Sequence, residues 1–368
     1  MRKYTHRVMP FFCNLFYTSF ILFFTGNLQA QLLKVGVAGL NHDHAYGLMG
    51  QYKKGEVIIL GIAEPDMQLA ERYKKRYQLP DSIFYKTVPD MLARIHPDAV
   101  LAYNAIADHM AVVAACAPLG ISVMVEKPLS TNVQDAKRMA ALAAQYHIQL
   151  LTNFETTWYA SNQQLYTMVK EEHAVGNVKK MVVHMGHQGP KEIGCSADFL
   201  QWLTDPIKNG GGAVMDFGCY GANLMTWLMD GNKPVAVTAV TRQLKPAVYP
   251  HVDDDATILL EYANGATGIV EASWNWPFGI KDWEVFGEKS YLHALNGSVL
   301  QKRDTAKYYD IPVKPPAYSS NLVYFADVLN GKIKSVNDLS SLQNNLIVVE
   351  ILEAAKKSAR EGRRILLN

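Results

Sequence analysis

The tripeptide Glu126-Lys127-Pro128 combines charged side chains with a position suited to catalysis. It follows directly on the apolar run 121–125, which has the composition of a buried strand. Ligands of open parallel sheets bind at the carboxyl ends of the strands, and a lysine there could hold a substrate oxygen. Glu126 could pair with the ammonium group. The alternative is an exposed lysine at a strand end.

Asp216 and Tyr220 form a second pair whose residue types and spacing could transfer a proton. They stand four residues apart, so on a helix they share one face. A free tyrosine has a pKa of about 10, too high for a base at neutral pH, but a nearby lysine ammonium would stabilise the phenolate. With Lys127, the pair could take the proton of an alcohol that is oxidised. The alternatives are a packed aromatic ring and a helix cap after the glycine-rich residues 210–212.

A glycine turn over residues 39–44 could bind a phosphate group. The fingerprint of dinucleotide-binding folds is G-x-G-x-x-G between a strand and a helix. Only Gly39 is kept, while Asn41 takes the second place and His44 the third. Asparagine tolerates left-handed backbone angles, and amide groups at a helix N-terminus can still bind an anion. We include Gly39, Asn41 and His42 among the expected cofactor contacts. A turn that binds no ligand is the alternative.

The next strand-like run, residues 57–64, ends at Glu64, 25 residues after Gly39. An acid at this place accepts hydrogen bonds from the ribose hydroxyl groups of an adenosine and repels a 2′-phosphate. Together with the glycine turn it predicts a nicotinamide cofactor, NAD rather than NADP. A solvated carboxylate on a loop is the alternative.

Two domains of different character must position these residues. In residues 31–153, apolar strand-like runs alternate with helical patterns. This alternation predicts a parallel sheet with helices on both faces, which is a Rossmann dinucleotide-binding domain of the α/β class. The helix over 130–146 should be capped by Ser130. The expected strands are 33–39, 57–64, 98–103, 121–126 and 148–154.

Residues 154–368 contain strand-like runs in succession. Turn signals such as Asn264-Gly265 separate several of them, which predicts an α+β domain with a mostly antiparallel sheet. Helices near 213–230 and 338–360 should cover one face, and the last residues could pack back on the first domain. The expected strands are 178–186, 234–243, 255–262, 267–275, 282–286 and 290–294.

Residues 1–30 have the features of a secretory signal peptide. Three basic residues among the first seven precede an apolar run over 11–25, and Ala30 stands at a plausible cleavage position. The run is shorter than the roughly 20 residues that cross a bilayer, so we expect export with cleavage and only transient membrane contact. A membrane anchor is the alternative. Cleavage would change the formal net charge from +2 to −1, since 33 basic residues would remain against 34 acidic ones.

The composition, with 49% hydrophobic and 19% charged residues, is that of an ordinary globular protein. Neither the small net charge nor any run of basic residues indicates nucleic-acid binding. We predict no metal ion, because the H-x-H pattern of His42 and His44 has no third ligand at a known spacing. The cysteines at 13, 116, 195 and 219 form neither a C-x-x-C pattern nor a disulfide framework.

Several of these segments resemble the glucose–fructose oxidoreductase, inositol dehydrogenase and MocA (Gfo/Idh/MocA) family. Besides Gly39 and Glu64, the stretch 98–128 keeps the family's order of residues up to its Glu-Lys-Pro ending. The motif G-G-G-x-x-x-D-x-G-x-H/Y matches residues 210–220. The chain departs from the pattern at a Thr-Pro pair, which it lacks. Tyr220 stands where many members have histidine.

The resemblance implies a nicotinamide cofactor in the Rossmann domain and an open-faced sheet domain that supplies the substrate site. It also implies hydride transfer at a carbon of a sugar or cyclitol. Carried over residue by residue, it makes Lys127, Asp216 and Tyr220 the catalytic group. The residues that it places beside the cofactor are Asn104, His109 and Glu126.

Two further residues could contact a carbohydrate substrate. His187 stands near a strand end, and Trp276 belongs to an aromatic cluster over 273–278 that could stack on sugar rings. A satisfied surface histidine, core packing and a subunit contact are the alternatives. Since sheets of this family often pair, we expect a homo-oligomer, a dimer or tetramer joined through the sheet.

An exported member of this family needs a tightly bound cofactor that is regenerated on the enzyme, because no free NAD pool is maintained outside the cytoplasm. We therefore predict a periplasmic NAD(P)-dependent oxidoreductase that couples the oxidation of one sugar to the reduction of another. One alternative is an NAD-dependent glycoside hydrolase that oxidises its substrate transiently and then eliminates. Another is a sugar-binding protein that has lost redox chemistry, as the two missing glycines would allow.

Overall fold

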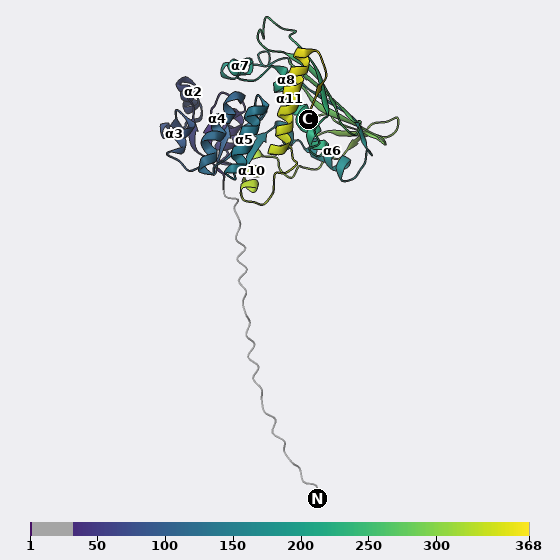
Figure 1. Ribbon diagram of the computed structural model, residues 1–368. Helices are drawn as coiled ribbons and strands as arrows, with labels where there is room; N and C mark the ends of the chain where they lie inside the picture. Colours follow the sequence, from purple (N-terminus) through teal and green to yellow (C-terminus); the bar gives the residue numbers. More distant parts are fainter. Residues whose placement is uncertain (2–31, 368) are drawn as a thin grey trace. The chain divides into compact units, whose positions relative to one another are not determined.

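The structure is a computed structural model that describes Met1 and residues 32–367. Apart from Met1, the predicted signal peptide therefore lies outside the described residues. From Leu32 onward the chain forms one unit that contains two sheets (Figure 1). In this described part, no helix combines the length and the apolar character that crossing a membrane requires.

The first sheet is parallel throughout, as its apolar strands predict. Its strand order is β3-β2-β1-β4-β5-β6. The order reverses between β1 and β4, and ligands of such sheets bind at this reversal, beyond the carboxyl ends of the strands. The strands are β1 (Lys34–Ala38), β2 (Ile58–Ala63), β3 (Phe84–Tyr85), β4 (Ala99–Ala102), β5 (Ser122–Glu126) and β6 (Leu150–Asn153).

Helices connect these strands in the order that the alternating pattern predicts. Two elements within residues 31–153 were not expected, β3 and α3, because two and five residues are too few to show a period. The cap of α5 is Asn132 and not Ser130, since the Asn132 side chain accepts the backbone N–H of Asp135 at 2.8 Å. The helices are α1 (Ala45–Lys53), α2 (Met67–Tyr77), α3 (Val88–Leu92), α4 (His109–Cys116) and α5 (Val133–Gln145).

The second sheet is antiparallel except where β7 and β10 run parallel, which confirms a mostly antiparallel sheet. Its order is β14-β13-β12-β11-β7-β10-β9-β8-β15. The strands are β7 (Val178–Gly186), β8 (Ala236–Arg242), β9 (Asp255–Glu261), β10 (Thr267–Ser273), β11 (Ile280–Gly287), β12 (Tyr291–Ala294), β13 (Leu300–Arg303), β14 (Tyr309–Ile311) and β15 (Ile365–Leu366).

Helices cover one face of this sheet. Alternate residues of a strand face opposite sides, so Met181, Val183 and Met185 of β7 are buried toward the helices and His184 lies on the other face. The helix expected over 213–230 is interrupted at Phe217. The helices are α6 (Ala160–Lys170), α7 (Ala197–Leu203), α8 (Ala213–Asp216), α9 (Gly218–Leu228), α10 (Asn321–Leu329) and α11 (Leu342–Glu361).

Late parts of the chain join the two sheets. In Figure 1, α11 (yellow) lies between the helices of the first domain and the green strands, and it contacts α5, α9 and β8. The helix α10 packs into the core of the first domain, where Phe325 belongs to the same buried cluster as Leu48. The expectation for the last residues is wrong, because Ile365 and Leu366 pair with β8 of the second sheet. It is α10 that returns to the first domain.

Candidate active site

Lys127 directly follows β5 and reaches across to the last residue of α8. Its Nζ donates to Oδ1 of Asp216 at 2.5 Å and to the main-chain oxygen of Asp216 at 3.0 Å. The two side chains are only 6% and 8% exposed. Two residues that lie 89 positions apart in the sequence thus form a buried ion pair between the domains.

Both members of this pair are charged at neutral pH. Burial alone would raise the pKa of Asp216, but the charge of Lys127 and its hydrogen bond outweigh that effect and hold the pKa below its usual value. Burial would lower the pKa of Lys127, but the attraction of Asp216 raises it instead. Oδ2 of Asp216 accepts a hydrogen bond from Nε1 of Trp274 at 3.0 Å, so each carboxylate oxygen has a partner.

Tyr220 lies beside the ion pair with 2% of its surface exposed. The ammonium groups of Lys127 and Lys281 stand 5.0 Å and 5.6 Å from the centre of its ring. Burial raises the pKa of Tyr220 well above its usual value, and the nearby carboxylate of Glu155 adds to this. The expected lysine-stabilised phenolate is therefore not supported. Tyr220 keeps its proton at neutral pH and can donate it.

His187, at the end of β7, belongs to the same group of residues. Its ring meets that of Phe217 at 4.9 Å between centres. Burial lowers its pKa, and among the charges that act on it are those of Asp216, Lys281 and Lys127. Because Nδ1 accepts the backbone N–H of Gly189 at 2.9 Å, the neutral ring carries its proton on Nε2. His187 is thus suited to donate a hydrogen bond rather than to act as a base.

Trp274, and not Trp276, is the tryptophan that reaches the ion pair. Trp276 is half-buried and lies 6.5 Å from His184, which is on the far face of β7. A side-chain carbon at Gly186 would lie 2.7 Å from the ring of Trp276, so that glycine makes room for it. The aromatic cluster lies in the right segment, but Trp274 and Trp276 both follow the end of β10 at Ser273, so the path of the chain there decides which ring reaches the site.

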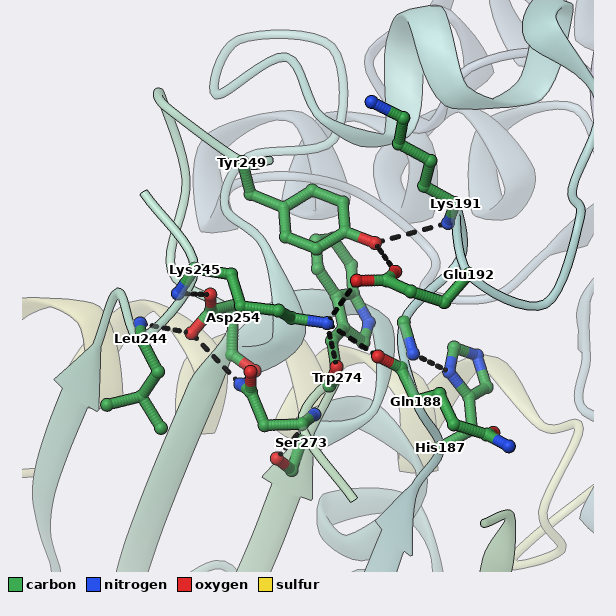
Figure 2. Close-up of polar contacts among 12 residues, drawn as sticks. His187, Gln188, Lys191, Glu192, Leu244, Lys245, Tyr249, Asp254, Ser273 and Trp274 are labelled. Atoms are coloured by element: carbon green, nitrogen blue, oxygen red, sulfur yellow. Dashed lines mark hydrogen bonds and ion pairs between the residues drawn. The ribbon is translucent and has the colours of Figure 1, made fainter. Parts of the chain in front are cut away.

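A hydrogen-bonded network fixes Trp274 and the loop after His187 (Figure 2). Nζ of Lys245 donates to the carbonyl oxygens of Gln188 at 2.6 Å and Trp274 at 2.7 Å, and to Oε1 of Glu192 at 2.5 Å. Three protons meet three acceptors, so the ammonium is saturated. The ring of Tyr249 packs against Trp274 at 4.9 Å. No sequence motif predicted this network, because its residues come from three separate loops.

Polar atoms without partners gather at the predicted cofactor turn. Gly39 has φ of +79°, and a side-chain carbon there would lie 2.6 Å from Cβ of Asn104. Among the described residues, Oδ1 of Asn41, Oδ1 of Asn104 and Nε2 of His109 are buried without a hydrogen-bond partner. Burying such atoms is costly unless a ligand satisfies them. These residues therefore fit a dinucleotide bound at the turn.

Glu64 lies beside the same turn and stabilises it through hydrogen bonds. Its oxygens accept the backbone N–H groups of Leu40 at 2.7 Å and Asp66 at 2.8 Å. Burial raises the pKa of this carboxyl group, which is 3% exposed. Each oxygen has a second lone pair, so a ribose hydroxyl can still bind there.

His42 packs beneath α7, a contact that the sequence did not predict. It is 1% exposed, and its ring packs 4.8 Å from Phe199 and 5.4 Å from Trp202 of α7. Nε1 of Trp202 also donates to the main-chain oxygen of Asn41 at 3.0 Å. His42 thus packs against α7 and supports the turn from beneath it.

Glu126 faces a cavity of about 420 Å³ that begins at the turn. Its oxygens bond to Nδ1 of His44 and Nδ2 of Asn153, each at 2.8 Å. The cavity is also lined by Tyr103, Glu155 and Trp158. Potential ligand atoms of His42, His44 and Glu126 lie within 4.8 Å of one another, a grouping that the sequence spacing did not reveal. Within this grouping His44 and Glu126 bond directly to each other, and the absence of a metal ion stays a prediction.

Both domains match sequence models of known protein families. Residues 33–154 match the sequence model of an oxidoreductase family with an NAD-binding Rossmann fold, and residues 162–293 match that of the GFO/IDH/MocA C-terminal domain. The trans-1,2-dihydrobenzene-1,2-diol dehydrogenase of Xenopus laevis is 23% identical over 218 residues. That match covers 58% of this chain and 60% of the dehydrogenase, so it spans less than two thirds of the relative.

Solved structures share the fold over most of the chain. The aldose-aldose oxidoreductase of Caulobacter crescentus, in complex with glycerol, superimposes with a TM-score of 0.77 and 22% identity, covering 92% of this chain and all of that one. An inositol dehydrogenase homologue from Azotobacter vinelandii, in complex with NAD⁺, has a TM-score of 0.79 and 16% identity, covering 92% and 98%. The similarity extends across both domains.

Proposed function

The chain belongs to the Gfo/Idh/MocA oxidoreductase family, and from this premise we propose that it transfers a hydride between a nicotinamide cofactor and a carbon of a sugar, cyclitol or related carbohydrate. The observation that carries the proposal is the buried pair of Lys127 and Asp216 against the protonated Tyr220. Such a group can hold a substrate oxygen and supply its proton beside the cofactor turn.

Lys127 orients the substrate oxygen in this proposal. Its ammonium group has three protons, of which two are directed at Asp216, so the third is available for the substrate. Trp274 holds the second oxygen of Asp216 and thereby fixes the direction of the ammonium group. Tyr220 gives its Oη proton to the substrate oxygen when a carbonyl is reduced. In the oxidation direction the tyrosine must first lose that proton.

Asn41, Asn104 and His109 would hold the cofactor, since their unpartnered atoms surround the turn. When bound, the nicotinamide ring accepts or donates the hydride. The carboxylate of Glu64 would repel a 2′-phosphate and favours NAD over NADP. Titration of the purified protein with each cofactor, followed by protein fluorescence, tests this preference. Tighter binding of NADP would contradict it.

Export is part of the proposal and rests on the sequence of residues 1–30. Cleavage after Ala30 would leave a chain that begins at Gln31 and works in the periplasm with a bound, internally recycled cofactor. Mass spectrometry of the protein from its native compartment tests this, and an N-terminus at Met1 would contradict it. Cofactor that is lost on gel filtration would contradict internal recycling.

An NAD-dependent glycoside hydrolase is the second candidate, and Glu155 is the observation that favours it. Burial opposes ionisation of Glu155, but the charge of Lys281 and their hydrogen bond keep the pKa of Glu155 below its usual value. An ionised carboxylate near Tyr220 could remove an acidified C–H proton, which elimination requires. Solvent deuterium appearing in the product of a glycoside would favour hydrolysis, and a sugar lactone would favour the oxidoreductase.

We also propose a homo-oligomer joined through the second sheet. The face away from the helices carries Val240 and Phe286, which are 46% and 37% exposed. Polar residues such as Thr257 and Glu271 lie between these two side chains, so the proposal rests on the pairing of sheets in this family and not on a continuous apolar patch. Light scattering should give a dimer or tetramer mass, and a monomer at micromolar concentration would contradict this.

The direct test of the activity is a screen of free sugars and glycosides with NAD-loaded protein, followed by cofactor absorbance and product mass. The Lys127→Ala variant should lose turnover and keep the cofactor. Near-normal activity of that variant would refute the assignment. A protein that binds no cofactor on titration would instead favour a sugar-binding protein without redox chemistry.

A further inference from the structure

Lys281 faces the candidate site, although no motif marks it. It stands on β11 two residues before Trp283, and alternate residues of a strand share a face, so both point to the side that the helices cover. Its Nζ lies 5.6 Å from the centre of the Tyr220 ring. Its charge is also one of those that lower the pKa of His187. Lys281 therefore stands among the residues that would surround a substrate.

Glu155 approaches the same place from the first domain. It follows β6, and one of its oxygens is bound by the ammonium group of Lys281. The other oxygen accepts the hydroxyl proton of Tyr159 at 2.6 Å. Glu155 also lines the cavity that extends to Glu126 and the cofactor turn. The ion pair thus bridges the two domains at the edge of this cavity.

The charges around Tyr220 cancel. Lys127 is matched by Asp216, and Lys281 is matched by Glu155. Two further acidic residues, Asp43 and Glu126, line the cavity, and neither brings a positive charge to it. A carboxylate or phosphate on a substrate would therefore meet no unpaired cation among these residues and would be repelled by acids.

The two ion pairs differ in how freely a ligand can open them. The side chains of Lys281 and Glu155 are 30% and 44% exposed, whereas those of Lys127 and Asp216 are almost fully buried. Exposed ion pairs contribute little to stability, so replacing their mutual contact by contacts to a ligand costs little. A carboxylate that accepts hydroxyl protons and an ammonium group that donates to hydroxyl oxygens together suit a polyol.

We propose that Glu155 and Lys281 select the substrate of this site, and that the substrate class is an uncharged polyol, a neutral sugar or its glycoside, rather than a sugar acid or sugar phosphate. This inference rests on the proposed function, because it concerns the same site. It adds two specificity-determining residues and the charge of the substrate.

The test compares an aldohexose with its uronic acid on the NAD-loaded protein, by turnover and by saturation-transfer NMR, which needs no turnover. The wild-type protein should favour the neutral sugar by about tenfold or more in kcat/KM, or in affinity where turnover is slow. Glu155→Gln leaves Lys281 without its counter-charge, so this preference should fall by about tenfold and the uronic acid should gain. Lys281→Met should weaken binding of the neutral sugar, mainly through KM.

Lys208→Met is the matched control. Lys208 also forms an exposed ion pair between the domains, with Asp108 at 3.4 Å, and it belongs to no part of the site described above. This variant should keep the wild-type preference. A wild-type preference for the uronic acid, no binding of either sugar, or an unchanged preference in Glu155→Gln would each overturn the inference. Sugar binding with the expected selectivity but without hydride transfer would instead refute the proposed oxidoreductase activity and leave the selection by charge intact.

Discussion

Replacing Lys127 by methionine should strongly destabilise the fold as well as stop catalysis. The change leaves the carboxylate of Asp216 buried, with 8% of its side chain exposed and the hydrogen bond from Trp274 as its remaining side-chain partner. Breaking a buried ion pair by removing one partner costs about 3–5 kcal/mol. We expect a loss of this size in the free energy of unfolding at pH 7, measured by urea denaturation and protein fluorescence.

A double-mutant cycle separates the pair from other effects of the substitution. Asp216→Asn alone leaves a buried ammonium group and should also be costly, whereas the double variant buries no charge. The double variant should therefore lose less than the sum of the single losses, with a coupling energy of about 2 kcal/mol or more. Lys170 and Asp230 form a matched exposed pair, 27% and 50% exposed, for which the coupling should stay below about 1 kcal/mol.

The pH dependence has a definite sign. The pKa of Asp216 is lowered in the folded protein, so its stabilising contribution is present above its unfolded pKa of about 3.9 and is lost as pH falls through the folded value. In Lys127→Met, burial without a counter-charge raises this pKa, so the penalty disappears on protonation. The difference in the free energy of unfolding between the wild-type protein and Lys127→Met should therefore become smaller as pH falls toward 4. Two results would refute the reasoning. One is a double variant whose loss of stability equals the sum of the two single losses, and the other is a stability difference between wild type and Lys127→Met that does not change with pH.

Three further predictions concern the cofactor turn and the site. Gly39→Ala should lower the free energy of unfolding by about 2 kcal/mol more than Gly55→Ala, because both glycines have positive φ but only Gly39 is crowded, by Asn104. Of the two variants, only Gly39→Ala should impair cofactor binding. Equal melting temperatures of the two variants would contradict this prediction. Burial lowers the pKa of His109 to about 4, so stability should fall as pH drops from about 6.5 to about 4, by up to about 3 kcal/mol. His109→Gln should show a shallower slope over that range, and an unchanged slope would argue against the assignment. Because Tyr220 holds its proton, sugar oxidation should accelerate as pH rises toward about 10, and a rate that falls over this range would exclude Tyr220 as the proton acceptor.

Most of the first domain follows from the sequence, because its strands are buried apolar runs separated by helical patterns. The elements missed were short, such as β3, or depend on tertiary packing, such as α10, whose apolar face is completed by the core of the other domain. Capping was also misjudged, since Ser130 and Asn132 are both good caps and only the chain geometry selects Asn132.

The site residues that belong to sequence motifs were predictable, and those that reach the site only through packing were not. Lys127 and Asp216 lie in two such motifs, and the structure joins them. Lys281 lies on a strand whose alternation had to be known before it could be placed on the inner face, whereas Trp274 follows the end of β10, where the path of the chain directs its ring. The packing of His42 against α7 was not predicted, because nothing in the turn itself shows that α7 covers it.

Transfer of isotope from substrate to cofactor tests the central claim most directly. The NAD-loaded protein is incubated with a sugar deuterated at the carbon to be oxidised, and the cofactor is released and analysed by mass spectrometry. Direct hydride transfer at the site formed by Lys127, Asp216 and Tyr220 predicts deuterium on the nicotinamide ring in the wild-type protein and none in Lys127→Ala. Sugar oxidation that leaves deuterium neither on the cofactor nor on a reduced sugar product would contradict it.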